Sequence, residues 1–149
     1  MYDVLKEAKE RNTQISNLIP KIEDSNMKQN IREINESVTK IIHTIEKNPD
    51  KYSKMNTFFD YYLPKTLTIL TKYDEIENQA LTNKESAKFM KQTQDMIEKI
   101  NKAFKAQLSS LYQADIVDTG AEMKVFDTML KSDGYAEEDF FKKEGKNEE

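Results

Sequence analysis

The chain has 149 residues, 34% of them charged and 37% hydrophobic, which is enough for one domain with a substantial core. It has no cysteine, which excludes disulfides, thiolate metal ligands and a cysteine nucleophile. The formal net charge of −4 provides no basic surface for phosphate backbones, so we expect no nucleic-acid partner.

The pattern along the chain predicts helices throughout. Three glycines and three prolines supply little material for hairpin turns, and strand-like alternation is missing. No apolar run approaches the roughly 20 residues of a membrane span, and no signal-peptide core precedes the first helix. We therefore expect an all-α protein of the cytoplasm, or one held at the cytoplasmic face of the membrane.

The first predicted helix begins near Tyr2. Its apolar positions follow a three-four spacing as far as Ile22, with Asn12 as one polar member. Pro20 removes a backbone donor inside this pattern, so the helix should kink or end there. Because the spacing continues past the proline, we favour a kink.

A second helix is predicted from residue 27 to 48. Asp24, Ser25 and Asn26 supply turn and capping oxygens before it, and Asn48 ends it ahead of Pro49. The connection to the next helix is short, which favours antiparallel neighbours, and Asp50 is positioned to cap the helix that follows.

The central helix is predicted over residues 52–80, the stretch densest in aromatic and aliphatic side chains. Its apolar face is too wide for a two-stranded coiled coil and indicates a bundle. Pro64 should make the preceding turn bend, widen locally or open a gap in the backbone hydrogen bonds. Helical geometry points Tyr62 into the seam and Tyr61 away from it. The seam has these members: Tyr52, Met55, Phe59, Tyr62, Thr66, Ile69, Tyr73, Ile76 and Ala80.

Two further helices complete the prediction. A capping box of Thr82 and Glu85 starts a long helix that ends near residue 114, and residues 115–120 break the period. A second box at Thr119 starts a short final helix, which stops before Gly134. The tail over 135–149 is acidic and predicted to be flexible, with Phe140 and Phe141 as its only candidate anchors.

The predicted architecture is an all-α antiparallel bundle of four long helices plus a short C-terminal helix, with the central helix kinked at Pro64. Residues 1–134 form a single domain in this prediction, and residues 135–149 form the tail.

Catalytic chemistry has few candidates in this sequence. His43 is the only histidine, and the spacing places it opposite the apolar seam of its helix, where an exposed surface residue is expected. There is no glycine-rich phosphate loop, and Arg11 and Arg32 are the only arginines. The Glu-x-x-His motif of carboxylate-rich metal bundles does not occur. We therefore predict no catalytic residue, no cofactor and no metal ligand.

One surface is a candidate for partner binding. Tyr61 is an outward aromatic residue beside the irregularity at Pro64, with Asp60 and Lys65 as charged neighbours. We predict a docking surface made of Asp60, Tyr61 and Lys65.

Two stretches resemble a known family. The sequence FFDYYLPKTLTILTKYDEIE at 58–77 and the sequence AFKAQLSSLYQADIVDTGAEMKVFDTMLKSDG at 103–134 are similar to those of the XpaC family, the bacterial 5-bromo-4-chloroindolyl phosphate hydrolysis proteins. Members of that family commonly carry an N-terminal membrane segment, so we expect this chain to be the excised soluble part or a soluble relative. The resemblance supplies no catalytic residue to carry over.

The resemblance and the residues leave three functions open. The first is a non-enzymatic interaction module in a bacterial envelope or toxic-anion stress system, with a toxic-anion-resistance protein as the implied partner. The second is a hydrolase of phosphate esters, as the family description says. The third is a structural homodimer that buries the remaining apolar stripe.

Overall fold

The computed structural model describes residues 1–135, and every regular element among them is helical. This confirms the prediction of an all-α fold. The chain divides into two units, Met1–Leu111 and Tyr112–Glu149. The prediction of one domain over 1–134 stays a prediction.

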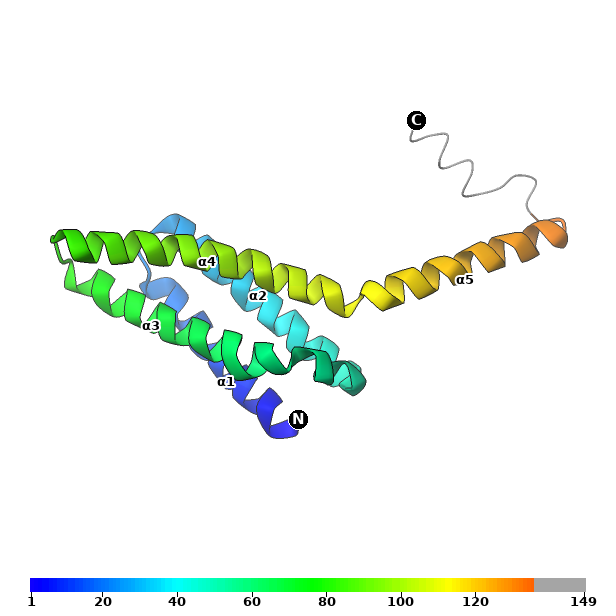
Figure 1. Cartoon of the computed structure of the whole chain (residues 1–149), viewed down its shortest axis with the longest axis horizontal. Helices are drawn as coiled ribbons and strands as arrows, with labels where there is room; N and C mark the ends of the chain where they lie inside the picture. Colours follow the sequence, from blue (N-terminus) through cyan, green and yellow to red (C-terminus); the bar gives the residue numbers. More distant parts are fainter. Residues whose placement is uncertain (136–149) are drawn as a thin grey trace, which may run out of the picture. The chain divides into compact units, whose positions relative to one another are not determined.

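The first unit holds four α-helices and three short helical segments (Figure 1). In chain order they are α1 Tyr2–Leu18, the 3-10 turn η1 Ile19–Lys21, α2 Ser25–Lys47, the 3-10 segment η2 Pro49–Met55, the π-helical segment η3 Phe58–Tyr62, α3 Leu63–Gln79 and α4 Lys84–Leu111. The second unit holds α5 Gln113–Ser132. None of these helices is both long enough and apolar enough to cross a membrane.

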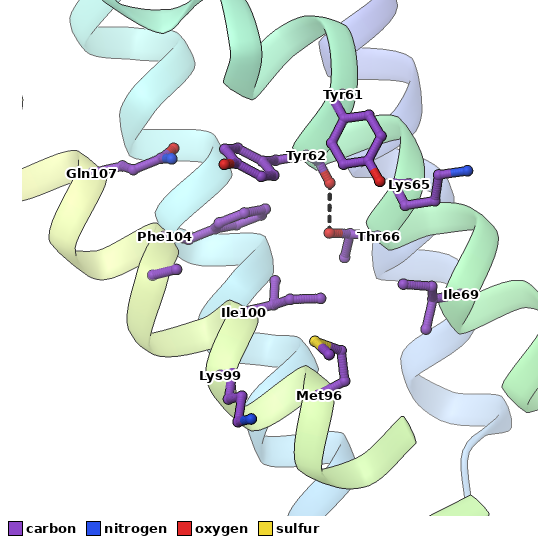
Figure 2. Close-up of a pocket in the computed structure, with 11 residues that line it drawn as sticks. Tyr61, Tyr62, Lys65, Thr66, Ile69, Met96, Lys99, Ile100, Phe104 and Gln107 are labelled. Carbon is purple, nitrogen blue, oxygen red and sulfur yellow. Dashed lines mark hydrogen bonds between the residues drawn. The ribbon is translucent and has the colours of Figure 1, made fainter. Parts of the chain in front are cut away.

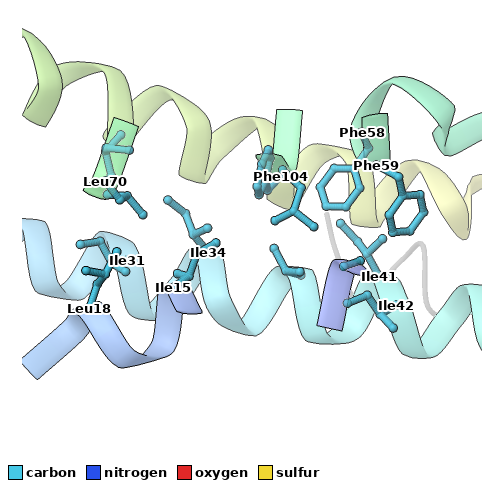
Figure 3. Close-up of a cluster of buried hydrophobic side chains, with 14 of the residues drawn as sticks. Ile15, Leu18, Ile31, Ile34, Ile41, Ile42, Phe58, Phe59, Leu70 and Phe104 are labelled. Atoms are coloured by element: carbon cyan, nitrogen blue, oxygen red, sulfur yellow. The ribbon is translucent and has the colours of Figure 1, made fainter. Parts of the chain in front are cut away.

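Helices α1 to α4 surround one shared core. Helix α2 packs against α1 and α4, and α3 also packs against α1 and α4. Isoleucines of α1 and α2 and the phenylalanines of η3 and α4 belong to this core, and Figure 3 shows Ile41 of α2 beside Phe58 and Phe59 of η3. The more detailed prediction, an antiparallel bundle with a kinked central helix, stays a prediction. The largest fully buried side chains include Tyr73, Phe58, Phe59, Phe104, Ile15, Ile22, Met27, Ile31, Ile34, Ile41, Ile45 and Leu63.

The end of α1 differs from the prediction. The helix ends at Leu18, and Pro20 lies in the 3-10 turn η1, so the favoured kink was wrong. The cause is local: proline has no N–H for a helical hydrogen bond, and its ring crowds the preceding turn. Ile22 follows in an extended conformation and is nevertheless buried, which explains why the apolar spacing continued past the proline.

The bounds of α2 agree with the prediction. Its N-cap is Asp24, whose carboxylate accepts a hydrogen bond from the amide of Met27 at 2.9 Å. Asn48 follows its last residue and precedes Pro49. The expected cap at Asp50 was wrong, because a 3-10 segment begins at Pro49 and has no side-chain cap.

The stretch before Pro64 is a π-helix. The amide of Leu63 donates to the carbonyl of Phe58, five residues back, which is the π-helical pattern. A regular α-turn would press the proline ring against the carbonyl of Asp60. Widening the turn relieves this crowding, which confirms one of the three distortions predicted here.

The start of α4 and the break between α4 and α5 were both predicted wrongly. Helix α4 starts after Asn83, whose side-chain oxygen accepts from the amide of Ser86 at 2.7 Å, so the capping residue is one position after Thr82. The break falls at Tyr112, and α5 runs unbroken through Thr119 and the rest of the expected break. Isolated Asp, Thr and Gly residues each cost a helix about 1 kcal/mol or less, which is too little to interrupt it.

The end of α5 agrees with the prediction. Gly134 has φ +80, and its amide donates to the carbonyl of Lys131 while that of Tyr135 donates to Leu130. These bonds form a Schellman motif, which favours glycine at the left-handed position. The helix is nevertheless 20 residues long, so the prediction of a short one was wrong. Of the predicted tail, residues 136–149 with Phe140 and Phe141 lie outside the described residues.

Candidate functional site

The buried face can be followed through the π-helical segment. Met55 is buried before it, Phe58 and Phe59 are buried within it, and Leu63 and Thr66 are buried after it. The expectation that Tyr62 points into the core was wrong: Tyr62 is 44% exposed and Leu63 is 0% exposed. Leu63, four residues after Phe59, occupies the buried position that the prediction gave to Tyr62, while Thr66 and Tyr73 are buried as predicted.

Two tyrosines therefore lie side by side at the surface. Tyr61 is 55% exposed, as its predicted outward orientation requires, and its ring meets that of Tyr62 edge-on at 5.7 Å between centroids. The ammonium of Lys65 lies 5.8 Å from the centroid of the Tyr61 ring, within the range of a cation–π contact. The hydroxyl of Thr66 donates to the carbonyl of Tyr62 at 2.6 Å and so fixes the start of α3.

These residues form one wall of a groove with a volume of about 440 Å³, which we name the Tyr61 groove. Figure 2 shows side chains of η3 and α3 on one side facing side chains of α4 on the other. The first wall consists of Tyr61, Tyr62, Lys65, Thr66 and Ile69, and the α4 wall consists of Met96, Lys99, Ile100, Ala103, Phe104 and Gln107.

Contacts within the first unit hold the two walls together. At one end, the side-chain amide of Gln94 on α4 donates to the hydroxyl of Tyr73 on α3 at 2.9 Å. At the other end, the rings of Phe58 and Phe104 meet edge-on at 5.0 Å. Thr66 is buried and lines the groove together with Phe104. The groove therefore lies on a packed base rather than on mobile loops.

The charges of the groove are all of one sign. Lys65 and Lys99 belong to opposite walls, and no Asp or Glu lines the groove, although acidic residues outnumber basic ones by 27 to 23 in the chain. Neither lysine forms an ion pair with a described residue. The side-chain oxygen of Gln107 is fully enclosed and has no donor among residues 1–135.

The predicted docking residues are only partly brought together. Tyr61 and Lys65 both line the groove, whereas Asp60 is exposed and does not line it. The prediction omitted Tyr62 and the whole α4 wall. A signal for that wall was present, because Met96, Ile100, Ala103 and Gln107 form a second row at helical spacing beside the buried row of α4.

His43 and the acidic side chains of the described residues lie outside the groove. His43 is exposed, as predicted. Within residues 1–135, no three His, Asp or Glu side chains are grouped so that they could hold a metal ion.

Polar side chains also join α2 to α4, one of them, Asn101, buried and another, Lys105, exposed. The side-chain amide of Asn101 donates to that of Asn30 at 2.9 Å, and the ammonium of Lys105 donates to Glu33.

The fold and the groove define the class: an all-helical protein with an apolar, lysine-flanked groove between two packed helices. A family model described as "5-bromo-4-chloroindolyl phosphate hydrolysis protein" matches residues 2–126. The chain belongs to this family, which confirms the XpaC resemblance. No curated protein and no solved structure was found to match the chain.

Proposed function

We propose that this chain is a non-enzymatic interaction module that binds a segment of a partner protein in the Tyr61 groove. The observation that carries the proposal is the row of uncovered apolar and aromatic side chains between η3–α3 and α4. Aromatic residues and exposed apolar patches with a polar rim are typical of protein-binding surfaces. The antiparallel helical bundle serves as the rigid support in this proposal.

The cellular setting of the proposal comes from the family. We place the module in a bacterial envelope or toxic-anion stress system, in the cytoplasm or at the cytoplasmic face of the membrane. A toxic-anion-resistance protein is the proposed partner. Support for this setting comes from the family resemblance alone.

The second candidate function is hydrolysis of a phosphate ester. The family description favours it, and Lys65 and Lys99 could hold phosphoryl oxygens beside the aromatic wall. Hydrolysis also needs an activated nucleophile and its base. His43 is the only histidine, and it does not line the groove.

A cross-linking experiment tests the interaction module. A photoreactive phenylalanine analogue replaces Tyr61 in one variant and Tyr2, which is exposed on α1 outside the groove, in the matched control. We expect a discrete cross-linked protein from the Tyr61 position and none from the Tyr2 position. Tyr61→Ala should weaken the capture while changing the free energy of unfolding by less than about 0.5 kcal/mol, because the side chain is exposed.

An activity assay separates the two functions. The purified chain is incubated with 5-bromo-4-chloroindolyl phosphate, with and without divalent metal. We expect no hydrolysis of this ester above the rate measured without the protein. Turnover that is lost on changing His43 or the two groove lysines, in a variant of unchanged melting temperature, would establish the hydrolase and refute the non-enzymatic proposal.

A further inference from the structure

We infer that the segment bound in the Tyr61 groove is an acidic amphipathic helix of a partner protein. This inference rests on the proposed function and specifies the chemistry of the partner. Three features of the groove support it: its apolar lining, its length and the sign of its charges.

The apolar lining requires a helix. A bound segment must satisfy its own backbone N–H and C=O groups, because unpaired groups are costly once they leave water. The polar side chains of the lining are those of Tyr61, Tyr62, Lys65, Lys99 and Gln107, and the hydroxyl of Thr66 already donates to a backbone carbonyl. These separate side chains do not form the regular row of partners that an extended backbone needs. No strand occurs among residues 1–135, so no sheet edge is present there to pair with an extended peptide. A helix satisfies its backbone internally and presents only side chains to the groove.

The length of the groove fits a short helical stretch. Residues 61–69 on the first wall and 96–107 on the α4 wall extend about 12 and 16 Å at the rise of an α-helix. Two to three helical turns cover that distance, so the partner contributes roughly three apolar side chains at three-four spacing. Ile69 of the first wall and Ile100 of the α4 wall are half-buried, and in this proposal they contact the apolar side chains of the partner helix.

The charges require an acidic helix. Lys65 and Lys99 lie on opposite walls and have no carboxylate partner in the part of the chain that the structure describes. A helix lying between them places its two flanks beside the two lysines. Carboxylates on those flanks are attracted to Lys65 and Lys99, whereas lysines or arginines in the same places would be repelled. The groove therefore selects a partner helix that carries Asp or Glu on either side of its apolar row.

Binding of designed peptides tests this inference with the full chain. Two labelled peptides of about 20 residues, long enough to form a helix, share the same leucine row and differ only in their flanks, which carry glutamate in one and lysine in the other. Fluorescence anisotropy measures their affinities. We expect the glutamate peptide to bind at least about tenfold more tightly than the lysine peptide, with the difference falling as salt is raised.

Charge reversal supplies the matched control. The double variant Lys65→Glu, Lys99→Glu should reverse the preference of the groove for the two peptides. The variant Lys40→Glu, Lys88→Glu changes the net charge by the same amount at exposed lysines outside the groove, and it should retain the wild-type preference. All four substitutions are on exposed side chains, so both variants are expected to fold.

Three results would overturn the inference. Equal binding of the two peptides would refute the acidic preference. Self-association of the wild-type chain that is lost in the Lys65→Glu, Lys99→Glu variant would make a second copy the occupant. If neither peptide bound while the photoreactive residue at position 61 still captured a protein, the occupant would not be an acidic helix, and the interaction module itself would stand.

Discussion

Glu33 links α2 to α4 through its carboxylate. Lys105 and Asn101 of α4 and Gln29 of its own helix all donate hydrogen bonds to it. These donors, with the Lys105 ammonium first among them, hold the pKa of Glu33 below the usual carboxyl value. The ionised form is thus the one that the folded chain favours.

This lowered pKa predicts a pH dependence of stability. A carboxyl group whose pKa is lower in the folded chain stabilises the fold above its unfolded pKa and loses that contribution as the pH falls through its folded pKa. Glu33→Gln should therefore lower the urea midpoint at neutral pH, and its difference from wild type should shrink below about pH 4.5, the usual range of a Glu carboxyl. Urea unfolding at pH 7 and pH 3 measures this.

Glu36 supplies the control for that measurement. It is exposed on the same helix and forms no ion pair with a described residue. Glu36→Gln should leave the urea midpoint close to wild type at both pH values. If Glu33→Gln had the same small effect as Glu36→Gln at pH 7, the contact with Lys105 would not contribute to stability.

The two surface tyrosines illustrate what a single sequence can and cannot predict at the level of residues. Tyr61 was correctly predicted to point outward, and it is 55% exposed. Tyr62 was assigned to the core because the count took a step of three residues after Phe59. The buried residue is Leu63, four residues after Phe59, and a three-four pattern does not decide between the two steps.

At the level of elements, the π-turn changes the backbone hydrogen bonds without shifting the buried face by a residue. Met55, Phe59, Leu63, Thr66, Leu70 and Tyr73 are all buried, at successive spacings of four, four, three, four and three residues. That spacing is the one expected of a single apolar helical face. Tyr61 and Tyr62 lie off this face and line the groove.

The success of helix-boundary prediction varied with the signal used. The start of α2 at Asp24 and the stop at Gly134 were correct, because a cap or a left-handed residue acts within one turn. The break expected near Thr119 was wrong, because weak helix formers can be carried inside a long helix. The end of α1 near Pro20 shows the reverse case, in which a strong local signal outweighed a continuing apolar pattern.

At the level of the whole first unit, one core supports all four helices. Ile34 is fully buried, whereas Ile69 on the groove wall is only half-buried. Ile34→Ala should cost roughly 2–5 kcal/mol of unfolding free energy, as large-to-small changes in cores do. Ile69→Ala should cost less and should act mainly on partner binding. Denaturant unfolding of the two variants measures the difference, and equal losses would mean that the groove wall is part of the core.

The all-helical architecture was predictable because it follows from composition and periodicity, which are properties of the whole chain. The groove was only half predictable, because its second wall comes from a helix about 35 residues further on, and spacing within one helix does not tell which other helix will lie beside it.

The buried Tyr73 gives this protein a built-in optical probe. The chain has no tryptophan and seven tyrosines, and Tyr73 is 0% exposed. Burial raises the pKa of its phenol above the usual value. In an alkaline titration followed by phenolate absorbance, its signal should therefore appear last and should coincide with the collapse of the helical circular dichroism. Ultraviolet spectroscopy can in this way follow unfolding of the first unit without any added dye.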